Sequence, residues 1–331
     1  MADWNLRKTT IALVTGNGFD RDLGLPSSFS QFAESKEWRN LLLAYGITGD
    51  NGQEQDLSLL WHLNNAIKPN WFDIEEEIHQ FVKSHHNISD EQAYRIQKEF
   101  DALNRAFYNY LQRVTKDFKA ANTSLAYQFL MNLPKCPVYI TDYSFNYTIP
   151  DSFVGELQES PVPFHITREH IHGSLKDNDI IIGCDPEKNE EVNRLLSFTY
   201  KYNKLKHANF INLSLDEARE VIFFGHSING MDFCYFREFF KKASYSYNSQ
   251  KDVTIITWDE NSERNIKDNI RSQGISVTDL YNSLSSFTFI HSSKIYNGDK
   301  IEIEKWKDFL FRITEEAKAE YNNKNLLVQE Q

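Results

Sequence analysis

The sequence predicts an α/β protein with a Rossmann-like, mostly parallel sheet and a helical insertion. Three observations support this fold class. Short apolar, β-branched runs recur along the chain, helical patterns separate most of them, and a long helical stretch at 28–132 stands between the first run and the second. Strands that alternate with helices are typical of a parallel sheet with helices on its faces.

The strands are expected where apolar runs are bounded by glycine or polar residues. The first run, TIALVT at 10–15, ends at Gly16. A buried parallel strand has such a continuous apolar run because both of its faces are covered. The other expected strands are 137–141, 180–183, 221–225, 253–258 and, more weakly, 287–290, with helical patterns at 187–197, 231–244 and 260–272.

The stretch after the first strand is expected to be mostly helical. Pro26 and the serines that follow suit a turn and a helix start near residue 28. Ser89 and Gln92 resemble a capping box, and apolar residues follow at helical spacing over 93–118, which predicts a long amphipathic helix. We therefore expect a Rossmann core at 1–27 and 133–300, a helical insertion at 28–132, and a C-terminal helix and tail at 301–331.

Composition narrows the possible functions. The 47 acidic and 36 basic side chains give a net charge of −11, which makes nucleic acid an unlikely general partner. Cys136, Cys184 and Cys234 form neither a disulfide framework nor a zinc-spaced pair, as expected in the cytoplasm. We expect no membrane span, because no apolar run reaches about 18 residues, and no secretory leader.

The turn after the first strand is the first candidate binding segment. It contains Gly16, Asn17, Gly18, Phe19 and Asp20. Ligands of open parallel sheets lie at the carboxyl ends of the strands. The two glycines could let a phosphate approach the backbone, and N–H groups at the next helix start favour an anion. A tight turn that binds no ligand is the alternative.

Two further segments carry side chains suited to chemistry. Asn146 follows the strand expected at 137–141, where its amide could hold a ribose hydroxyl or a water, or could cap a turn. If HIHGS at 170–174 is extended, His170 and His172 share one face. A neutral imidazole can accept a proton near neutral pH. A buried structural histidine is the alternative, and no standard spacing supports a metal site.

Two more strand ends complete the set. Gly225, His226 and Ser227 follow one apolar run, and their backbone N–H groups and hydroxyl could hold a phosphate or a ribose. Asp259 follows another and could bind ribose hydroxyls or cap a helix. Asp232 could likewise serve as a cap. Because so many polar, glycine-bearing segments end strands of one sheet, the sequence predicts a nucleotide site.

These segments, in this order, resemble the AbiH family of bacteriophage abortive-infection proteins. The residues that carry the resemblance are VTGNGFDRDLGLPSSFSQF at 14–32, WFDIEEEI at 71–78, SFNYT at 144–148, HIHGS at 170–174 and FFGHSINGMD at 223–232. The resemblance implies a role in phage defence.

The same order is similar to a diverged SIR2 site, which holds NAD in SIR2-like proteins. By that resemblance Gly16, Asn17 and Gly18 would lie against the pyrophosphate. Asn146 would contact the nicotinamide ribose and His172 would act as the base there. Ser227 would lie near the adenosine half.

Two departures from the SIR2 pattern argue against protein deacylation. The chain has no zinc ribbon of paired cysteines. Thr148 stands where sirtuins carry an Asp that contacts nicotinamide.

The leading functional hypothesis is a phage-defence NAD glycohydrolase that cleaves the nicotinamide–ribose bond, with NAD as its ligand and no metal. The alternative is a non-enzymatic nucleotide sensor or scaffold that regulates a partner effector. A metal-dependent nuclease or phosphatase using His170 and His172 is a third possibility. Since uncontrolled NAD loss would kill the host, we expect a homo-oligomer or a partner defence protein to regulate the activity.

Overall fold

The chain forms two compact units, each described here on its own. The computed structural model describes residues 11–47, 57–67, 73–133, 139–154, 166–186, 192–203, 211–229, 231–246 and 249–316. Unit 1 comprises 1–24, 119–171 and 207–331, and unit 2 comprises 25–118 and 172–206. The ranges expected from the sequence place 172–206 with the core and 119–132 with the insertion, so the two divisions differ at these segments.

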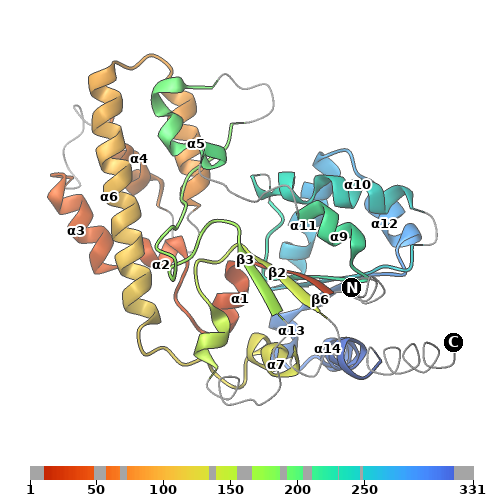
Figure 1. Ribbon diagram of the computed structural model, residues 1–331. Helices are drawn as coiled ribbons and strands as arrows, with labels where there is room; N and C mark the ends of the chain where they lie inside the picture. The colour runs from red at the N-terminus through yellow and green to blue at the C-terminus, as the bar shows by residue number, and fades with distance from the viewer. Residues whose placement is uncertain are drawn as a thin grey trace, which may run out of the picture. The chain divides into compact units, whose positions relative to one another are not determined.

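Unit 1 is built on a six-stranded parallel sheet in the order β3-β2-β1-β4-β5-β6 (Figure 1). Its strands are β1 (Ile11–Thr15), β2 (Ile140–Ser144), β3 (Ile166–His170), β4 (Glu220–Phe224), β5 (Asp252–Thr257) and β6 (Ser286–His291). This is the strand order of dinucleotide-binding Rossmann folds, so the predicted fold class is confirmed. The strand order reverses at β1, which pairs with both β2 and β4. In such sheets the ligand crevice lies outside the carboxyl ends of the strands at this point.

Helices cover both faces of this sheet. They are α1 (Asn17–Asp22), α7 (Leu125–Asn132), α9 (Ile211–Glu217), α10 (Arg237–Tyr245), α11 (Glu260–Ser272), α12 (Val277–Ser283), α13 (Ser292–Tyr296) and α14 (Lys300–Phe311), with short turns η3 (Pro150–Phe153), η7 (Asp232–Tyr235) and η8 (Arg312–Glu316). Figure 1 shows α9–α12 on one face and α1, α7, α13 and α14 on the other. The alternation along β4 agrees, because Phe223 packs on Phe240 of α10 and Phe224 packs on Trp306 of α14.

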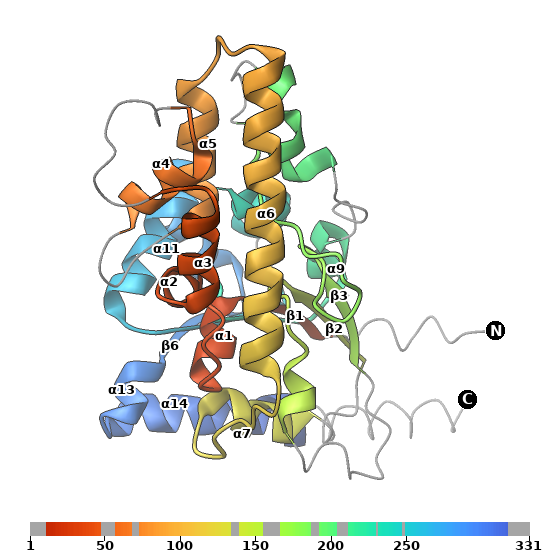
Figure 2. The ribbon, with the colours of Figure 1, turned by 90° about the vertical axis from the view of Figure 1, so that its left-hand side faces the viewer.

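Unit 2 is helical. It contains α2 (Phe29–Ala33), α3 (Lys36–Ala44), α4 (Leu59–Ala66), α5 (Ile74–Ser84), α6 (Asp90–Thr115), η4 (Arg194–Thr199) and η5 (Lys201–Asn203). The capping box predicted at Ser89 starts α6, the long helix that runs the length of this unit in Figure 2. A second capping box at Ser28 starts α2, close to the expected position. The predicted apolar stripe is buried at Ile96, Phe100 and Leu103.

The local structure differs from expectation at four points. Residues 180–183 form no strand in the described part of the chain, although Ile182 is fully buried. The strand β3 was missed, because its sequence ITREH is short and polar. This strand ends at His170 and a turn follows, so His170 and His172 do not share a strand face. The β2 strand begins at Ile140, later than expected, and residues 137 and 138 lie outside the described ranges.

The remaining features concern the hydropathy of the helices and the state of the cysteines. Among the residues that the structure describes, no helix is both long and apolar enough to span a bilayer. Cys184 is buried and burial raises the pKa of its thiol to about 12, whereas Cys234 is exposed. Cys136 and part of the helix expected at 187–197 fall outside the described ranges, as does the tail beyond residue 316.

Candidate functional site at the carboxyl edge of the sheet

The glycine turn after β1 packs directly against the turn after β4. The N–H of Gly16 donates to Phe224 O at 3.1 Å, and the N–H of Gly18 donates to Gly225 O at 2.8 Å. A Cβ added to Gly16 would lie 2.7 Å from Gly225 O, and one added to Gly18 would lie 2.7 Å from Gly225 Cα. Glycine is therefore needed here so that two backbone turns can touch. The close approach expected of a phosphate from the two glycines is made in the structure by the backbone of the turn after β4.

The turn after β1 is helical rather than a loop. Gly16 is the N-cap of α1, so Asn17, Gly18, Phe19 and Asp20 form its first turn. Asn17 is exposed. The side chain of Phe19 is fully buried in the core, where it packs on Phe224 at a ring-centroid distance of 4.7 Å. Phe19 was one of the five residues of this segment predicted to bind cofactor. Its ring is instead part of the hydrophobic core.

Asn146 ties the end of β2 to this turn. Its Nδ2 donates to Gly16 O at 2.9 Å and to Asp20 Oδ1 at 3.1 Å, and the residue is 3% exposed. Both partners are acceptors, which fixes the orientation of the amide. Its Oδ1 accepts no hydrogen bond from the described residues, so this oxygen remains available to an outside donor. Thr148 completes the junction by donating to Asp20 Oδ2 at 2.6 Å, a contact that no motif could indicate.

His170 lies beside Asn146 at the same edge of the sheet. In the strand register Thr15, Ser144 and His170 are neighbours across β1, β2 and β3. The ring of His170 donates from Nδ1 to the main-chain oxygen of Asn146 at 2.8 Å. Because a carbonyl oxygen can only accept, the proton of a neutral ring lies on Nδ1 and the lone pair on Nε2.

A buried ion pair supports this edge of the sheet from within. Asp142 of β2 is fully buried and accepts from Arg168 of β3 at 2.6 Å and from Thr15 at 2.9 Å. Arg168 also reaches Asp151 at 2.5 Å. Burial raises the pKa of Asp142 and Arg168 opposes that shift. These charge-assisted hydrogen bonds link β1, β2, β3 and η3.

His172 belongs to unit 2 and has a different environment. It is 4% exposed, and Lys201 Nζ lies 3.4 Å from its Nε2. Lys201 is itself buried and pairs with Glu75 Oε2 of α5 at 2.5 Å. Asp73 caps α5 ahead of this glutamate, and the first two residues of the WFDIEEEI segment fall outside the described ranges. Lys201 was missed by sequence reasoning because no recognised motif contains it.

In the turn after β4, His226 has a structural role and Ser227 is exposed to solvent. His226 is buried, its Nδ1 accepts from the N–H of Ile228 at 2.9 Å, and its Nε2 lies 3.6 Å from Asp232. Ile228 has a φ of +48°, a strained value for a β-branched residue. Ser227 is exposed. Of this predicted group, Ser227 therefore presents its side chain to solvent and His226 holds the turn together.

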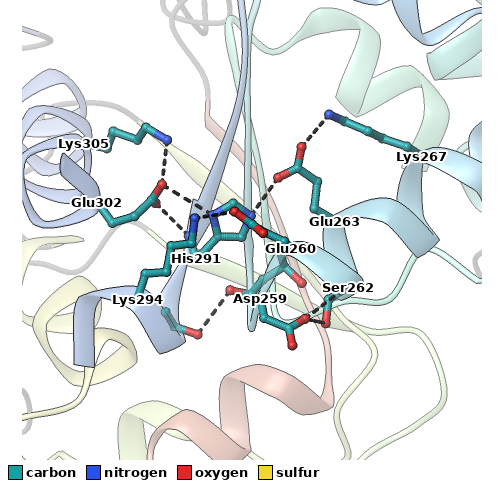
Figure 3. A network of polar contacts seen from close by, with 11 residues as sticks. Asp259, Glu260, Ser262, Glu263, Lys267, His291, Lys294, Glu302 and Lys305 are labelled. Atoms are coloured by element: carbon teal, nitrogen blue, oxygen red, sulfur yellow. Dashed lines mark hydrogen bonds and ion pairs between the residues drawn. The ribbon is translucent and has the colours of Figure 1, made fainter. Parts of the chain in front are cut away.

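Asp259 acts as a helix cap at the end of β5. Its Oδ1 accepts from the N–H and the hydroxyl of Ser262, both at 2.8 Å, which lowers the pKa of the carboxyl group (Figure 3). A neighbouring network in the same figure centres on buried His291. Its ring Nε2 lies 2.7 Å from Glu263, and its main-chain N–H donates to Glu302 at 3.0 Å. The capping alternative is thus realised at Asp259, and one carboxylate oxygen is committed to it.

The described residues contain no cluster of three or more His, Cys, Asp or Glu side chains placed to hold a metal ion. Hydrogen bonds instead link Asn146 to Gly16, Asp20 and His170, and the turn after β1 is joined to Gly225 through the N–H of Gly18. This set joins the ends of β1, β2, β3 and β4.

A comparison with protein families gives a match over most of the chain. The family model for bacteriophage abortive infection AbiH proteins matches residues 12–251. The chain belongs to the AbiH family. No curated protein and no solved structure matches it significantly. The matched range begins at the second residue of β1, covers β2, β3 and β4 of this AbiH chain together with the whole of unit 2, and ends just before β5.

Proposed function

We propose that this AbiH protein acts in abortive infection by binding NAD at the carboxyl edge of the sheet and cleaving its nicotinamide–ribose bond. The observation that carries the proposal is the amide of Asn146. Its two N–H groups are held by Gly16 and Asp20, and its Oδ1 stays oriented at the point where strand order reverses. A rigid acceptor at this point suits a ribose hydroxyl or an attacking water.

The reaction requires the protein mainly to position the water and the ribose. Nicotinamide leaves readily because its ring nitrogen is positively charged while bonded to the ribose. Asn146 Oδ1 would orient the water beside the ribose C1′ carbon, and a histidine of the HIHGS segment would accept its proton. Holding reactants in such a geometry is worth about 7–11 kcal/mol in favourable cases.

The ends of the dinucleotide would lie along the same edge. The pyrophosphate would cross the turns at Gly16–Gly18 and Gly225, and the adenosine half would extend toward Ser227 and the end of β5. The exposed hydroxyl of Ser227 is the side chain of this group that faces solvent. No metal ion is part of the proposal.

The test is to incubate purified protein with NAD at neutral pH and to measure release of nicotinamide and ADP-ribose by chromatography. Asn146→Ala should abolish release. Thr148→Val is the matched control, because it also removes one hydrogen bond to Asp20 but leaves the amide of Asn146 in place. It should retain activity once matched to the wild type for folded fraction.

The possible outcomes separate the two main hypotheses. Binding of NAD without turnover, in every assembly state and with the partner supplied, would contradict hydrolysis and favour the sensor or scaffold function. Equal loss of activity in both variants would show that the junction with Asp20, rather than the free oxygen of Asn146, carries the effect.

A further inference from the structure

We propose that Trp258, backed by Tyr296, is the surface on which the adenine ring of the dinucleotide stacks. This inference rests on the proposed function, because it concerns the half of NAD that does not react. Trp258 directly follows the last residue of β5, so it lies at the carboxyl edge of the sheet in unit 1, the unit that contains Asn146 and the glycine turns. The sequence analysis named Asp259 at this strand end and passed over the aromatic residue before it.

Trp258 and Tyr296 form an exposed aromatic pair. Trp258 is 59% exposed and Tyr296 is 46% exposed, whereas Trp38 and Trp306 are buried. The centroids of the exposed pair lie 6.4 Å apart, and the ring planes make an angle of 39°. A large aromatic ring left in contact with water retains an apolar face that a flat ligand can cover. Aromatic side chains bind nucleobases in this way, by stacking on the π-face of the base.

Both residues of the pair are held in place by hydrogen bonds within unit 1. The main-chain oxygen of Trp258 accepts from the N–H of Ser293, at the start of α13, at 2.9 Å. The hydroxyl of Tyr296 donates to Asp22 Oδ1 of α1 at 2.6 Å and accepts from the N–H of Leu125 at 3.1 Å. The ring behind Trp258 is therefore fixed to α1 and α7. A surface that is already ordered loses little conformational entropy when a ligand covers it.

The position of Trp258 suits the adenosine end of a dinucleotide. Strand β4 lies between β1 and β5, and neighbouring strands are about 4.8 Å apart, so the ends of β1 and β5 are about 10 Å apart. One ribose separates a pyrophosphate from adenine, and it can span this interval.

The face of the sheet on which Trp258 lies is also the correct one. Phe224, which packs on α14, is the register partner of Ile256, and the alternation of side chains places Trp258 on that same face. Helix α1, whose N-terminus would meet the pyrophosphate, covers this face as well (Figure 1).

This contact contributes affinity and not rate. Stacking on the adenine ring is remote from the ribose C1′ carbon that reacts, so it stabilises the bound substrate and the transition state equally. Its loss should raise KM and leave kcat nearly unchanged. The contact also gives a reason for the enzyme to prefer the whole dinucleotide over nicotinamide mononucleotide, which contains the same scissile bond but no adenine.

The test measures binding of ADP and turnover of two substrates in wild type and Trp258→Ala. ADP has the adenine and the pyrophosphate but no nicotinamide, so equilibrium dialysis of labelled ADP reports on the site without any reaction. We expect Trp258→Ala to weaken ADP binding by about 5–150-fold, the range for loss of one stacked base. KM for NAD should rise by a similar factor, while cleavage of nicotinamide mononucleotide should stay within about twofold of wild type.

Two further variants make the comparison specific. Trp258→Phe keeps an aromatic face and should recover most of the affinity for ADP that Trp258→Ala loses. Tyr245→Ala is the matched control, because Tyr245 is 68% exposed but ends α10, the helix that leads to the start of β5 at the opposite edge of the sheet. It should bind ADP like the wild type.

The outcomes distinguish this inference from the proposed function. Nicotinamide release with unchanged NAD kinetics and unchanged ADP binding in Trp258→Ala would overturn the adenine site and leave hydrolysis intact. A smaller oligomer in light scattering, with ADP binding unaltered, would also overturn it and identify Trp258 as a contact between copies of the chain. Binding of ADP that depends on Trp258, without any nicotinamide release, would support the adenine site and contradict hydrolysis.

Discussion

The amide of Asn146 donates to the carboxylate of Asp20 at 3.1 Å, and this bond joins the loop after β2 to the first turn of α1. Asp20 is 1% exposed and also accepts from Thr148. A buried carboxylate needs such donors, because an unpaired buried charge is costly. Asn146, which is proposed to face the substrate, therefore also stabilises the fold by satisfying Asp20. Experiments on Asn146 must separate these two roles.

Replacing Asn146 by Asp should destabilise unit 1 in a pH-dependent way. The variant loses the two N–H donors and places a second carboxylate against Asp20 and Gly16 O. The hydrogen bond to the Asp20 carboxylate contributes about 1.5–3 kcal/mol and the one to Gly16 O about 0.5–1.5 kcal/mol, and like-charge repulsion adds to their loss. Urea unfolding should show a lower midpoint at pH 7 and a smaller deficit near pH 5, where one carboxyl group of the pair can be protonated. An equal deficit at both pH values would contradict the charge-pair explanation.

Gly225 should tolerate no side chain. Its φ is +66°, and an added Cβ would lie 2.2 Å from the backbone nitrogen of Phe19. Gly225→Ala must therefore separate the turns after β1 and β4, and we expect a loss of several kcal/mol in unfolding free energy or no folded protein. Gly274→Ala is the control, since its φ is +75° but nothing lies within 4 Å of the added Cβ. It should cost only the conformational strain, about 1 kcal/mol. Equal losses measured by thermal unfolding would refute the importance of the contact.

Local sequence patterns predicted the parts of the fold that depend on apolar runs. The strand at 10–15 could be predicted because every side chain of β1 is buried. The polar sequence of β3 could not, since Arg168 belongs in the sheet only through its partner Asp142 on another strand. The opposite error occurs at Ile182. Its apolar run predicted a strand, but the residue is buried without belonging to one.

The candidate site was predictable in position but not in its contacts. The topology of a parallel sheet places Asn146 and the turn at Gly16 at one edge, and the sequence contains that information. The bonds of Asn146 to Asp20 and of His170 to Asn146 depend on side chains far apart in the sequence. The same is true of Lys201, whose partner Glu75 lies on a helix more than a hundred residues earlier.

Removing one partner of the buried pair Lys201–Glu75 should damage unit 2 more than removing both. Lys201→Met leaves the carboxylate of Glu75 without its 2.5 Å ion-pair partner in a buried setting. Breaking a buried pair costs about 3–5 kcal/mol, whereas replacing both members with uncharged residues of similar size is often nearly neutral. Lys201→Met combined with Glu75→Gln should therefore be more stable than Lys201→Met alone in urea unfolding. If the double variant is the less stable one, other contacts of Lys201 dominate.

Asp259 should contribute to stability as a cap whether or not it meets a ligand. Asp259→Ala removes the acceptor for the N–H of Ser262 and should cost about 0.5–2 kcal/mol, while Asp259→Asn, which can also cap, should cost much less. Because the pKa of Asp259 is lowered, chiefly by the Ser262 backbone N–H, its contribution is present above the ordinary value of 3.8 and is lost as pH falls. Thermal unfolding of both variants at pH 7 checks the prediction, and similar losses in both would contradict it.

Because of Glu220, the free energy of unfolding should fall as pH rises toward 7. This carboxyl group stands at the start of β4, and burial raises its pKa to about 7, although Arg312 opposes the shift through a 2.7 Å ion pair. The folded protein keeps the proton up to about pH 7, whereas the unfolded chain releases it near the ordinary value of 4.5. Between these values the native state binds more protons, so its stabilising contribution is full below 4.5 and lost as pH rises through 7.

The slope of that loss is at most about 1.4 kcal/mol per pH unit for one proton. Glu220→Gln should remove it, because an amide keeps an oxygen for Arg312 and has no proton to release. The measurement is urea unfolding of both proteins between pH 4.5 and 8, taken as a difference so that other titrating groups cancel. Glu304→Gln makes the same charge change at an exposed position and should leave the slope unaltered. If the difference between wild type and Glu220→Gln is flat across this range, Arg312 outweighs burial and Glu220 is ionised in the folded protein throughout it.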